Sequence, residues 1–301
     1  MSPALTRALV AAGMLVATSS PEVLAQRGHD VPAVRVAGQG PETFVLLSGL
    51  VGGVAGFRRL EAQLAEQNRR VISIDPYLLS IDSADVTFAA LARRVDRVLD
   101  WLGVTSVRVV GHAHGAGVAL RLAANDPQRV AALYFLDVGA LANHHSPIFS
   151  SSLRLVPVIA RIPGGRGFIR RRMIQGLEES AGRREWLDQN TERAYTQPML
   201  DGVDRAIALA LRLGRAEEPD SVAVVISRLT VPVTVLLGDA PHTAGPEQPE
   251  LVALEPLGSL LRVEHMAGVG HFPHEEAPAE TARWLIAPRS QIIAQHTPGA
   301  R

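Results

Sequence analysis

Apolar residues recur along the chain in two alternating spacings. Short, mostly apolar runs predict buried strands at residues 44–47, 70–74, 107–110, 130–136, 231–237 and 260–264. Apolar positions at i, i+3, i+4 and i+7 predict helices at 57–67, 85–102, 114–125, 251–257 and 277–286. Strands that alternate with helices predict an α/β fold, in which a mostly parallel central sheet is flanked by helices.

The alternation stops between residues 140 and 216. This stretch holds Pro157, a Pro163-Gly164-Gly165 turn and helical spacings near Trp186 and over 206–213, but no strand pattern. It predicts a helical cap inserted into the sheet domain. The expected organisation is a signal peptide at 1–25, a core at 26–139 and 217–290, a cap at 140–216 and a flexible tail at 291–301.

The N-terminal pattern is typical of an exported protein. Arg7 precedes an apolar run over 8–17, and Val23-Leu24-Ala25 offers small residues for a signal peptidase. The run is shorter than the ~20 apolar residues that span a bilayer. We therefore expect a cleaved signal peptide and a periplasmic mature protein. A retained N-terminal membrane anchor is the alternative, and no later segment is apolar enough to cross a membrane.

Composition narrows the possible partners and chemistry. Hydrophobic residues make up 47% of the chain and charged residues 20%, which suits a large buried core. The formal net charge is +0, so we expect no nucleic-acid partner. The chain has 0 cysteines, which excludes thiol catalysis, disulfides and thiolate metal sites.

Five short motifs follow the predicted strands in a fixed order. They are Leu-Ser-Gly-Leu at 47–50, Ile-Asp-Pro at 74–76, Gly-His-Ala-His-Gly at 111–115, Leu-Leu-Gly-Asp at 236–239 and Gly-Val-Gly-His-Phe at 268–272. In order and spacing they resemble the motifs of α/β-hydrolases, and the resemblance covers nearly all of the chain after the signal peptide. It implies a pocket at the carboxyl ends of the strands, without a cofactor.

The resemblance places Ala113 where the family carries its nucleophile. Glycines flank that turn so that strand and helix can pass closely, and the backbone N–H groups of His114 and Leu50 would form the oxyanion hole beside Gly49. The family often has His-Gly where this chain has Ser48 before Gly49. A methyl group cannot attack a carbonyl, so covalent catalysis through Ala113 is not expected.

The same resemblance makes His271 the general base. The usual place of the acid is taken by Pro241, and Asp239 lies two residues earlier. We expect Asp239 to be either a shifted acid or a solvent-exposed loop carboxylate. Asp137, after the preceding core strand, is the other candidate, although its position also fits a residue that fixes a loop. The sequence leaves the acid open.

Three other polar groups have ordinary interpretations. His112 and His114 flank Ala113 and suggest a metal together with His271, but no carboxylate is securely near them, so we predict no metal. The arginines of the cap could hold an acidic ligand or an anionic membrane surface, but we expect a solvated face. These arginines are Arg166, Arg170, Arg171 and Arg172. Three further histidines, His144, His145 and His274, are expected in loops or at the surface.

Three functions are consistent with these features. The first is an exported pseudo-hydrolase that binds a small, apolar or ester-like ligand. Leu50, Ala113, His114 and His271 would line the floor of its pocket, and Leu200, Ile207 and Leu211 its wall. The second is a carboxylic-ester-type hydrolase, either one in which His271 activates water or a serine hydrolase inactivated by a Ser-to-Ala change. The third is a cofactor-free lyase or oxygenase. Fold resemblance does not choose between them.

Overall fold

The computed structural model describes residues 22–24, 33–139, 141–142, 151–244 and 248–287. Most of the predicted signal peptide, the predicted tail at 291–301, and His144 and His145 lie outside the described residues.

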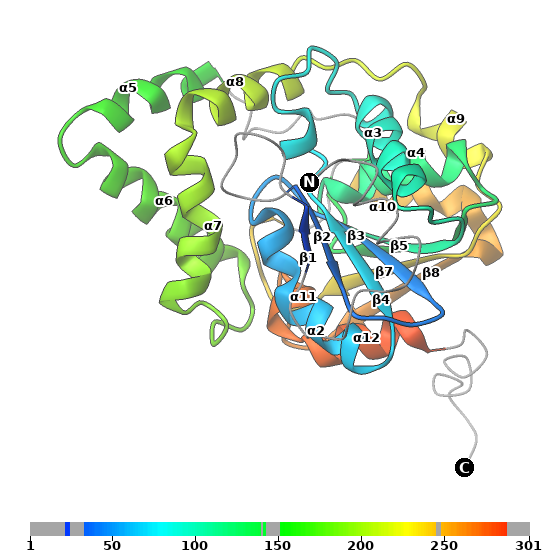
Figure 1. The fold of residues 1–301 in the computed structure, drawn as a ribbon. Coiled ribbons are helices and arrows are strands. Elements are labelled where there is room, and N and C mark those ends of the chain that lie inside the picture. The colour runs from blue at the N-terminus through cyan, green and yellow to red at the C-terminus, as the bar shows by residue number, and fades with distance from the viewer. Residues whose placement is uncertain (1–21, 25–32, 140, 143–150, 245–247, 288–301) are drawn as a thin grey trace.

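A mostly parallel sheet forms the centre of the molecule, as predicted (Figure 1). Its eight strands lie in the order β1-β2-β4-β3-β5-β6-β7-β8. Their bounds are β1 Glu22–Leu24, β2 Val34–Ala37, β3 Thr43–Leu47, β4 Arg70–Ile74, β5 Val107–His112, β6 Val130–Leu136, β7 Val233–Gly238 and β8 Leu261–Met266. All pairs are parallel except β1 with β2 and β2 with β4. The sequence did not predict β1 and β2, which are too short to give a clear apolar run.

Helices cover both faces of the sheet. On one face lie α2 (Arg58–Glu66) and α12 (Pro278–Ile286); on the other lie α3 (Phe88–Trp101), α4 (Gly115–Asn125), α9 (Val222–Ser227) and α10 (Gln248–Leu254). Alternate residues of a strand serve the two layers: Phe44 and Leu46 pack toward α2, whereas Val45 and Leu47 pack toward α3 and α4. Burial on both faces explains why the strands read as continuous apolar runs.

Between β6 and β7 the chain forms a helical insertion, which Figure 1 shows beside the sheet. It comprises the 3-10 helix Ser151–Leu155, α5 (Val156–Arg161), α6 (Gly165–Ser180), α7 (Gln189–Asp201) and α8 (Val203–Leu213). No strand occurs among the described residues of this stretch, in agreement with the predicted helical character. Within the part of the chain that the structure describes, no helix has the length and apolar character needed to cross a membrane.

Candidate functional site

The turn after β5 places Ala113 at the carboxyl edge of the sheet. Ala113 has a φ of 48°, in the left-handed region that a residue with a Cβ rarely adopts. Both flanking glycines are required by close approach. A Cβ on Gly111 would lie 2.6 Å from the Cα of Ala116, and one on Gly115 would overlap the carbonyl oxygen of Leu47. The turn therefore has the tight strand-to-helix geometry that presents a side chain at the sheet edge, although that side chain is a methyl group.

Two further loops meet Ala113. A Cβ on Gly49, after β3, would lie 3.3 Å from the Cβ of Ala113. A Cβ on Gly139, after β6, would lie 3.0 Å from the backbone nitrogen of His114. The structure thus brings Gly49, Ala113 and His114 together, with the partly buried Leu50 next along its loop. Their assignment to an oxyanion hole remains a prediction.

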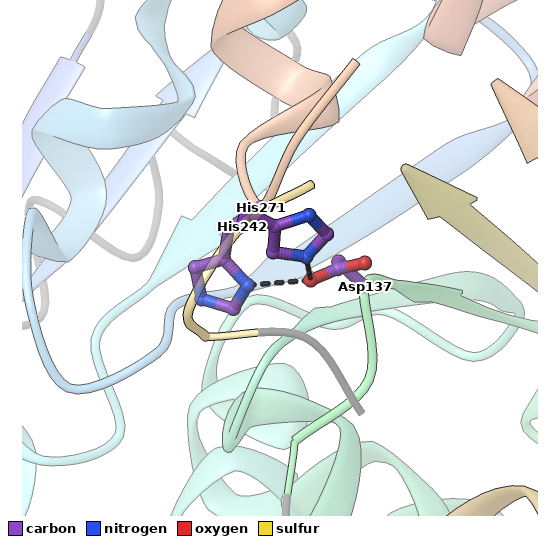
Figure 2. A group of neighbouring side chains, drawn as sticks. All are labelled: Asp137, His242 and His271. Carbon is purple, nitrogen blue, oxygen red and sulfur yellow. Dashed lines mark hydrogen bonds and ion pairs between the residues drawn. The ribbon is translucent and has the colours of Figure 1, made fainter. Parts of the chain in front are cut away.

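His271 lies on the loop between β8 and α11 (Pro273–Glu276). Its backbone N–H donates to the carbonyl oxygen of Ser180 at 2.8 Å, and the residue is buried, with 8% of its surface exposed. Nδ1 of the ring lies 2.6 Å from Oδ2 of Asp137, and Figure 2 draws this hydrogen bond as a dashed line. Because a carboxylate only accepts, Nδ1 carries the proton and Nε2 is left to accept one.

Asp137 directly follows β6 and is fully buried. Its φ of 43° is left-handed, and its backbone N–H donates to Leu236 at 2.8 Å, which holds the residue at the end of the sheet. Burial by itself would raise the pKa of the carboxyl group, but hydrogen bonds from His242 and His271 outweigh it and keep the pKa below its ordinary value. Asp137 is therefore an ionised carboxylate positioned against His271.

A second imidazole, His242, contacts the same carboxylate oxygen. Nε2 of His242 lies 3.0 Å from Oδ2 of Asp137, and Nδ1 lies 2.7 Å from the carbonyl oxygen of Ala240 (Figure 2). Both partners only accept hydrogen bonds, so the protonated imidazolium satisfies both contacts. Hydrogen bonding to Asp137 accordingly raises the pKa of His242, against the opposing effect of burial. His242 was not predicted from the sequence, although it directly follows Pro241 at the expected place of the acid.

Asp239 does not contact His271 in this arrangement. Its Oδ1 accepts the backbone N–H of Gly268 at 2.5 Å and so ties the end of β7 to the loop after β8. Of the two candidate acids, the structure brings Asp137 to His271 and leaves Asp239 in a loop contact. The reason is geometric. Asp239 lies two residues before the usual position of the acid, and from there its carboxylate binds the backbone of Gly268. Asp137 follows β6, which ends beside the His271 ring.

The remaining histidines of the site are buried. Nε2 of His112 donates to the carbonyl oxygen of His271 at 2.9 Å, and the His112 and His271 rings have centroids 4.7 Å apart. Burial, with the proximity of His271, lowers the pKa of His112 to about 3 and that of His114 to about 4. His274, expected at the surface, is instead 2% exposed and has its ring centroid 4.3 Å from that of His112. It faces inward, where it packs against the buried ring of Phe57, with centroids 4.9 Å apart.

Asp137, His242 and His271 also form the group from which a metal site could be built. Their ligand atoms lie within 4.8 Å of one another. Zinc needs its ligands about 2.0–2.2 Å from a common centre, with unprotonated ring nitrogens. Here both rings instead direct a nitrogen at the same carboxylate oxygen at hydrogen-bond distance. The three residues fit a hydrogen-bonded group better than a ligand set, and the predicted lack of a metal remains a prediction.

An aromatic cluster joins the helical insertion to the His271 loop. The ring centroid of Phe272 lies 5.0 Å from that of Trp186 and 6.0 Å from that of Tyr195. The predicted wall residues Leu200 and Ile207 are buried and Leu211 is partly buried. The ring contacts from the insertion to Phe272 come from Trp186 and Tyr195 instead.

Two adjacent glutamates on α11 fasten this junction. Glu276 accepts four backbone N–H groups, from Gly182, Arg183 and Gly270 at 2.9, 2.7 and 2.9 Å and from Phe272 at 3.1 Å. The buried Glu275 accepts from the hydroxyl of Tyr195 at 3.2 Å and pairs with Arg59 at 3.1 Å. Burial raises the pKa of Glu275 to about 7, against the opposing effects of these partners. The carboxylates therefore join the end of α6, α7 and α2 to the loop that carries His271.

Comparisons with known proteins agree with this architecture. A family model described as the alpha/beta hydrolase fold matches residues 42–156. An esterase of known structure from Thermogutta terrifontis superposes with a TM-score of 0.61 at 21% identity, covering 93% of this chain and 100% of that chain.

Two curated relatives are similar in sequence. The sn-1-specific diacylglycerol lipase ABHD11 of Mus musculus is 23% identical over 247 residues, which cover 78% of this chain and 77% of the lipase. RutD of Variovorax paradoxus (strain S110), a candidate carbamate hydrolase, is 35% identical over 112 residues. That match covers 35% of this chain and 41% of RutD, so the chain matches less than half of that relative.

Proposed function

We propose that this chain, which has the alpha/beta-hydrolase fold, hydrolyses a small, largely apolar carboxylic ester through attack by water, without a covalent intermediate. The observation that carries this proposal is the 2.6 Å hydrogen bond between Asp137 and His271. The bond supplies the orienting carboxylate that activation of water by a histidine requires. The hydrogen bond favours hydrolysis by water over a non-catalytic pocket, because it orients the His271 ring with Nε2 free to accept a proton.

The reaction would proceed in two proton transfers. Nε2 of His271 takes a proton from a water molecule as the water oxygen bonds to the ester carbonyl carbon and the π electrons move to the carbonyl oxygen. The N–H groups of Leu50 and His114 stabilise the oxyanion. The electron pair then returns, the carbon–alkoxide bond breaks, and the alkoxide takes the proton from His271. The products are a carboxylic acid and an alcohol.

The substrate class draws support from the comparisons. A diacylglycerol lipase and an esterase are both named for the hydrolysis of esters. In this chain Asp137 and His271 supply an acid and a base, but the attacking atom is missing, because Ala113 presents a methyl group. Water is the nucleophile that can replace a missing hydroxyl without any change in the backbone.

A second candidate is a non-catalytic binder of a small apolar ligand. Ala113 favours it, because loss of the nucleophile in covalent hydrolases leaves only the residual ~10³–10⁴-fold acceleration from the oxyanion hole and binding. A binding protein needs the pocket but has no use for proton transfer by His271. The two candidates therefore differ in whether a change of His271 alters any turnover.

Steady-state and pre-steady-state hydrolysis of p-nitrophenyl butyrate would test the proposal. We expect turnover without a burst and no labelling by a fluorophosphonate. His271→Ala should reduce kcat at least about 100-fold, as expected for loss of a general base. His265→Ala, at an exposed histidine on β8, is the matched control and should keep wild-type activity. Undiminished turnover in His271→Ala would refute water activation. No wild-type turnover, with apolar ligands still bound, would support the binder.

Ala113→Ser is the complementary experiment. The left-handed turn is already in place, so a serine should be labelled by the fluorophosphonate and give an acyl-enzyme burst. A failure of Ala113→Ser to react would argue that the oxyanion donors are misplaced.

We also propose that residues 1–25 direct export and are then removed. The support is the sequence pattern of Arg7, an apolar run and Val23-Leu24-Ala25. β1 (Glu22–Leu24) lies inside this segment, so cleavage after Ala25 would leave β2 as the edge strand. The mass of the mature N-terminus distinguishes cleavage from a retained anchor, which would keep β1.

A further inference from the structure

We propose that the hairpin of α5 and α6 docks the protein onto an anionic lipid bilayer. The docking hairpin comprises residues 154–172, at the end of the helical insertion that Figure 1 shows farthest from the sheet. The proposal does not depend on the chemistry at His271. It rests on the exposure of apolar side chains and on the distribution of charge along this hairpin.

The docking hairpin carries the most exposed large hydrophobic side chains of the described residues. The four most exposed large hydrophobic side chains of the described residues all lie on it: Leu155 at 60%, Val158 at 58%, Ile162 at 55% and Phe168 at 49%. Val158 lies on α5, and Leu155 and Ile162 flank its two ends, so the three exposed side chains form an apolar stripe along this short segment. Exposed apolar groups gathered in this way mark an interaction surface.

The charge of the same segment has one sign. Residues 151–172 contain six arginines and no acidic residue. Arg161 pairs with Asp204 at 2.9 Å. Arg154, Arg166 and Arg171 are exposed and form no ion pair with a described residue, which leaves their charge available to a partner. From the sequence, these arginines are expected on a solvated face, and the exposed apolar side chains beside them favour an anionic membrane surface instead.

The arginines lie beside the apolar groups. Phe168 on α6 is followed at i+3 and i+4 by Arg171 and Arg172, which occupy the same helix face. Arg154 lies next to Leu155 at the start of the stripe. Arginine can extend its guanidinium to lipid phosphates while its methylene groups follow the apolar side chains. Apolar groups of this kind enter the boundary between headgroups and acyl chains, and the surrounding basic groups bind anionic headgroups.

A bilayer fits this surface better than a protein does. Two docking hairpins placed face to face would bring twelve arginines together, which opposes a dimer through this surface. The hairpin projects from the molecule, whereas a folded acidic partner would need a matching groove (Figure 1). A lipid surface needs no preformed complementary shape.

The position of the hairpin relates the bilayer to the site. α6 has 16 residues, which correspond to a length of about 24 Å. Its N-terminal end carries Phe168, and its C-terminal residue Ser180 accepts the backbone N–H of His271. A protein docked through this hairpin would therefore hold the His271 loop at the inner end of the same helix.

Vesicle co-sedimentation of the full chain tests the proposal. The probes are vesicles of phosphatidylcholine alone and of phosphatidylcholine mixed equally with phosphatidylglycerol. We expect binding to the anionic vesicles only, reversed by high salt. Replacing Arg154, Arg166 and Arg171 together by glutamine should weaken binding about 100-fold, because each arginine contributes a factor of about five and the three factors multiply. Val158→Ser combined with Phe168→Ser should weaken it at least about tenfold by loss of apolar burial.

A matched charge variant makes the result specific. Arg58→Gln, Arg93→Gln and Arg97→Gln together remove the same charge from exposed positions on α2 and α3 and should leave binding intact. Each variant should first give the wild-type far-ultraviolet circular dichroism spectrum. Absence of binding to the anionic vesicles at low salt would overturn the proposal. Equal weakening by the two arginine triples would overturn it too, as would retention on a polyglutamate resin without vesicle binding, which would indicate an acidic protein partner.

Discussion

Oδ2 of Asp137 lies 2.6 Å from Nδ1 of His271, so the carboxylate at the end of β6 fixes the orientation of the imidazole on the loop after β8. His242 contacts the same oxygen from the loop after β7, at 3.0 Å. Three neighbouring strands thus each supply one residue of a single hydrogen-bonded group. The group can be tested one member at a time.

Asp137→Asn should abolish most of the proposed hydrolysis. The amide can present a donor to Nδ1, which favours the wrong tautomer of His271, and a comparable change in a catalytic triad lowers kcat about 10⁴-fold. The measurement is kcat for p-nitrophenyl butyrate. Asp239→Asn is the control, because its carboxylate binds Gly268, and it should change kcat less than about threefold. A larger loss for Asp239→Asn than for Asp137→Asn would contradict the assignment.

His242→Gln should reduce stability in a pH-dependent way. The pKa of His242 is raised in the folded state by its hydrogen bond to Asp137, so its stabilisation is present below the unfolded pKa of about 6.5 and is lost as pH rises through the higher folded pKa. The variant should be less stable than the wild type by about 1 kcal/mol at low pH. Urea unfolding at about pH 6 and about pH 9 should show the difference shrinking with pH.

Glu275→Gln should stabilise the protein at alkaline pH. The pKa of Glu275 rises from 4.5 to about 7 on folding, so the native state holds an extra proton between these values. Stability contributed by this group therefore falls as pH rises from about 4.5 to about 7. Glutamine keeps an acceptor for Tyr195 and removes the buried charge. We expect a gain of about 1–3 kcal/mol above pH 7 and little gain near pH 4.5. A constant difference across pH would contradict the titration of Glu275.

Glu276→Ala should loosen the junction between α6 and the His271 loop. Its carboxylate accepts four backbone N–H groups, and hydrogen bonds to a charged group contribute about 1.5–3 kcal/mol. We expect a loss of about 2–4 kcal/mol in urea unfolding and faster hydrogen exchange at Gly270 and Gly182. Glu280→Ala on α12 serves as the control. Equal losses of unfolding free energy in the two variants would show that the four hydrogen bonds of Glu276 do not stabilise the protein.

Gly115→Ala should prevent stable folding, because its Cβ would overlap the carbonyl oxygen of Leu47. The expected loss exceeds about 3 kcal/mol, by strain in a closely packed core. Gly176→Ala is the matched control. A Cβ there meets nothing within 4 Å on α6, and alanine should stabilise the helix by about 0.5–1 kcal/mol. Tolerance of Gly115→Ala, measured by thermal unfolding, would contradict the close approach of β3 to this turn.

The sequence predicted the central elements of the fold because their apolar spacing is strong. Six strands of the sheet and five of the helices that cover it follow continuous or i, i+3, i+4 patterns that burial on two faces or on one face requires. The six-residue helix α9 (Val222–Ser227) was not predicted. β2 (Val34–Ala37) was not predicted, because a strand of four residues is too short to show a clear apolar periodicity. The glycines around Ala113 were also interpreted correctly, since close approach leaves few alternatives at those positions.

The acid and its second partner could not be predicted because they depend on register between strands. Asp137 reaches His271 only because β6, β7 and β8 are neighbours whose ends align. The order and register of strands in a sheet cannot be derived from a single sequence. The histidine after Pro241 was the available signal for His242. His274 was misplaced at the surface because no periodicity distinguishes the two sides of the four-residue helix α11.

The bond between Ser180 and His271 has a mechanical consequence. α6 cannot swing as an independent flap, because its last residue and the two loop residues Gly182 and Arg183 are fastened to the segment that carries the imidazole. Any hinge that opened at this end would drag the ring away from Asp137. A molecule that enters from solvent must therefore approach His271 without displacing the C-terminal end of α6, which stays bound to the His271 loop.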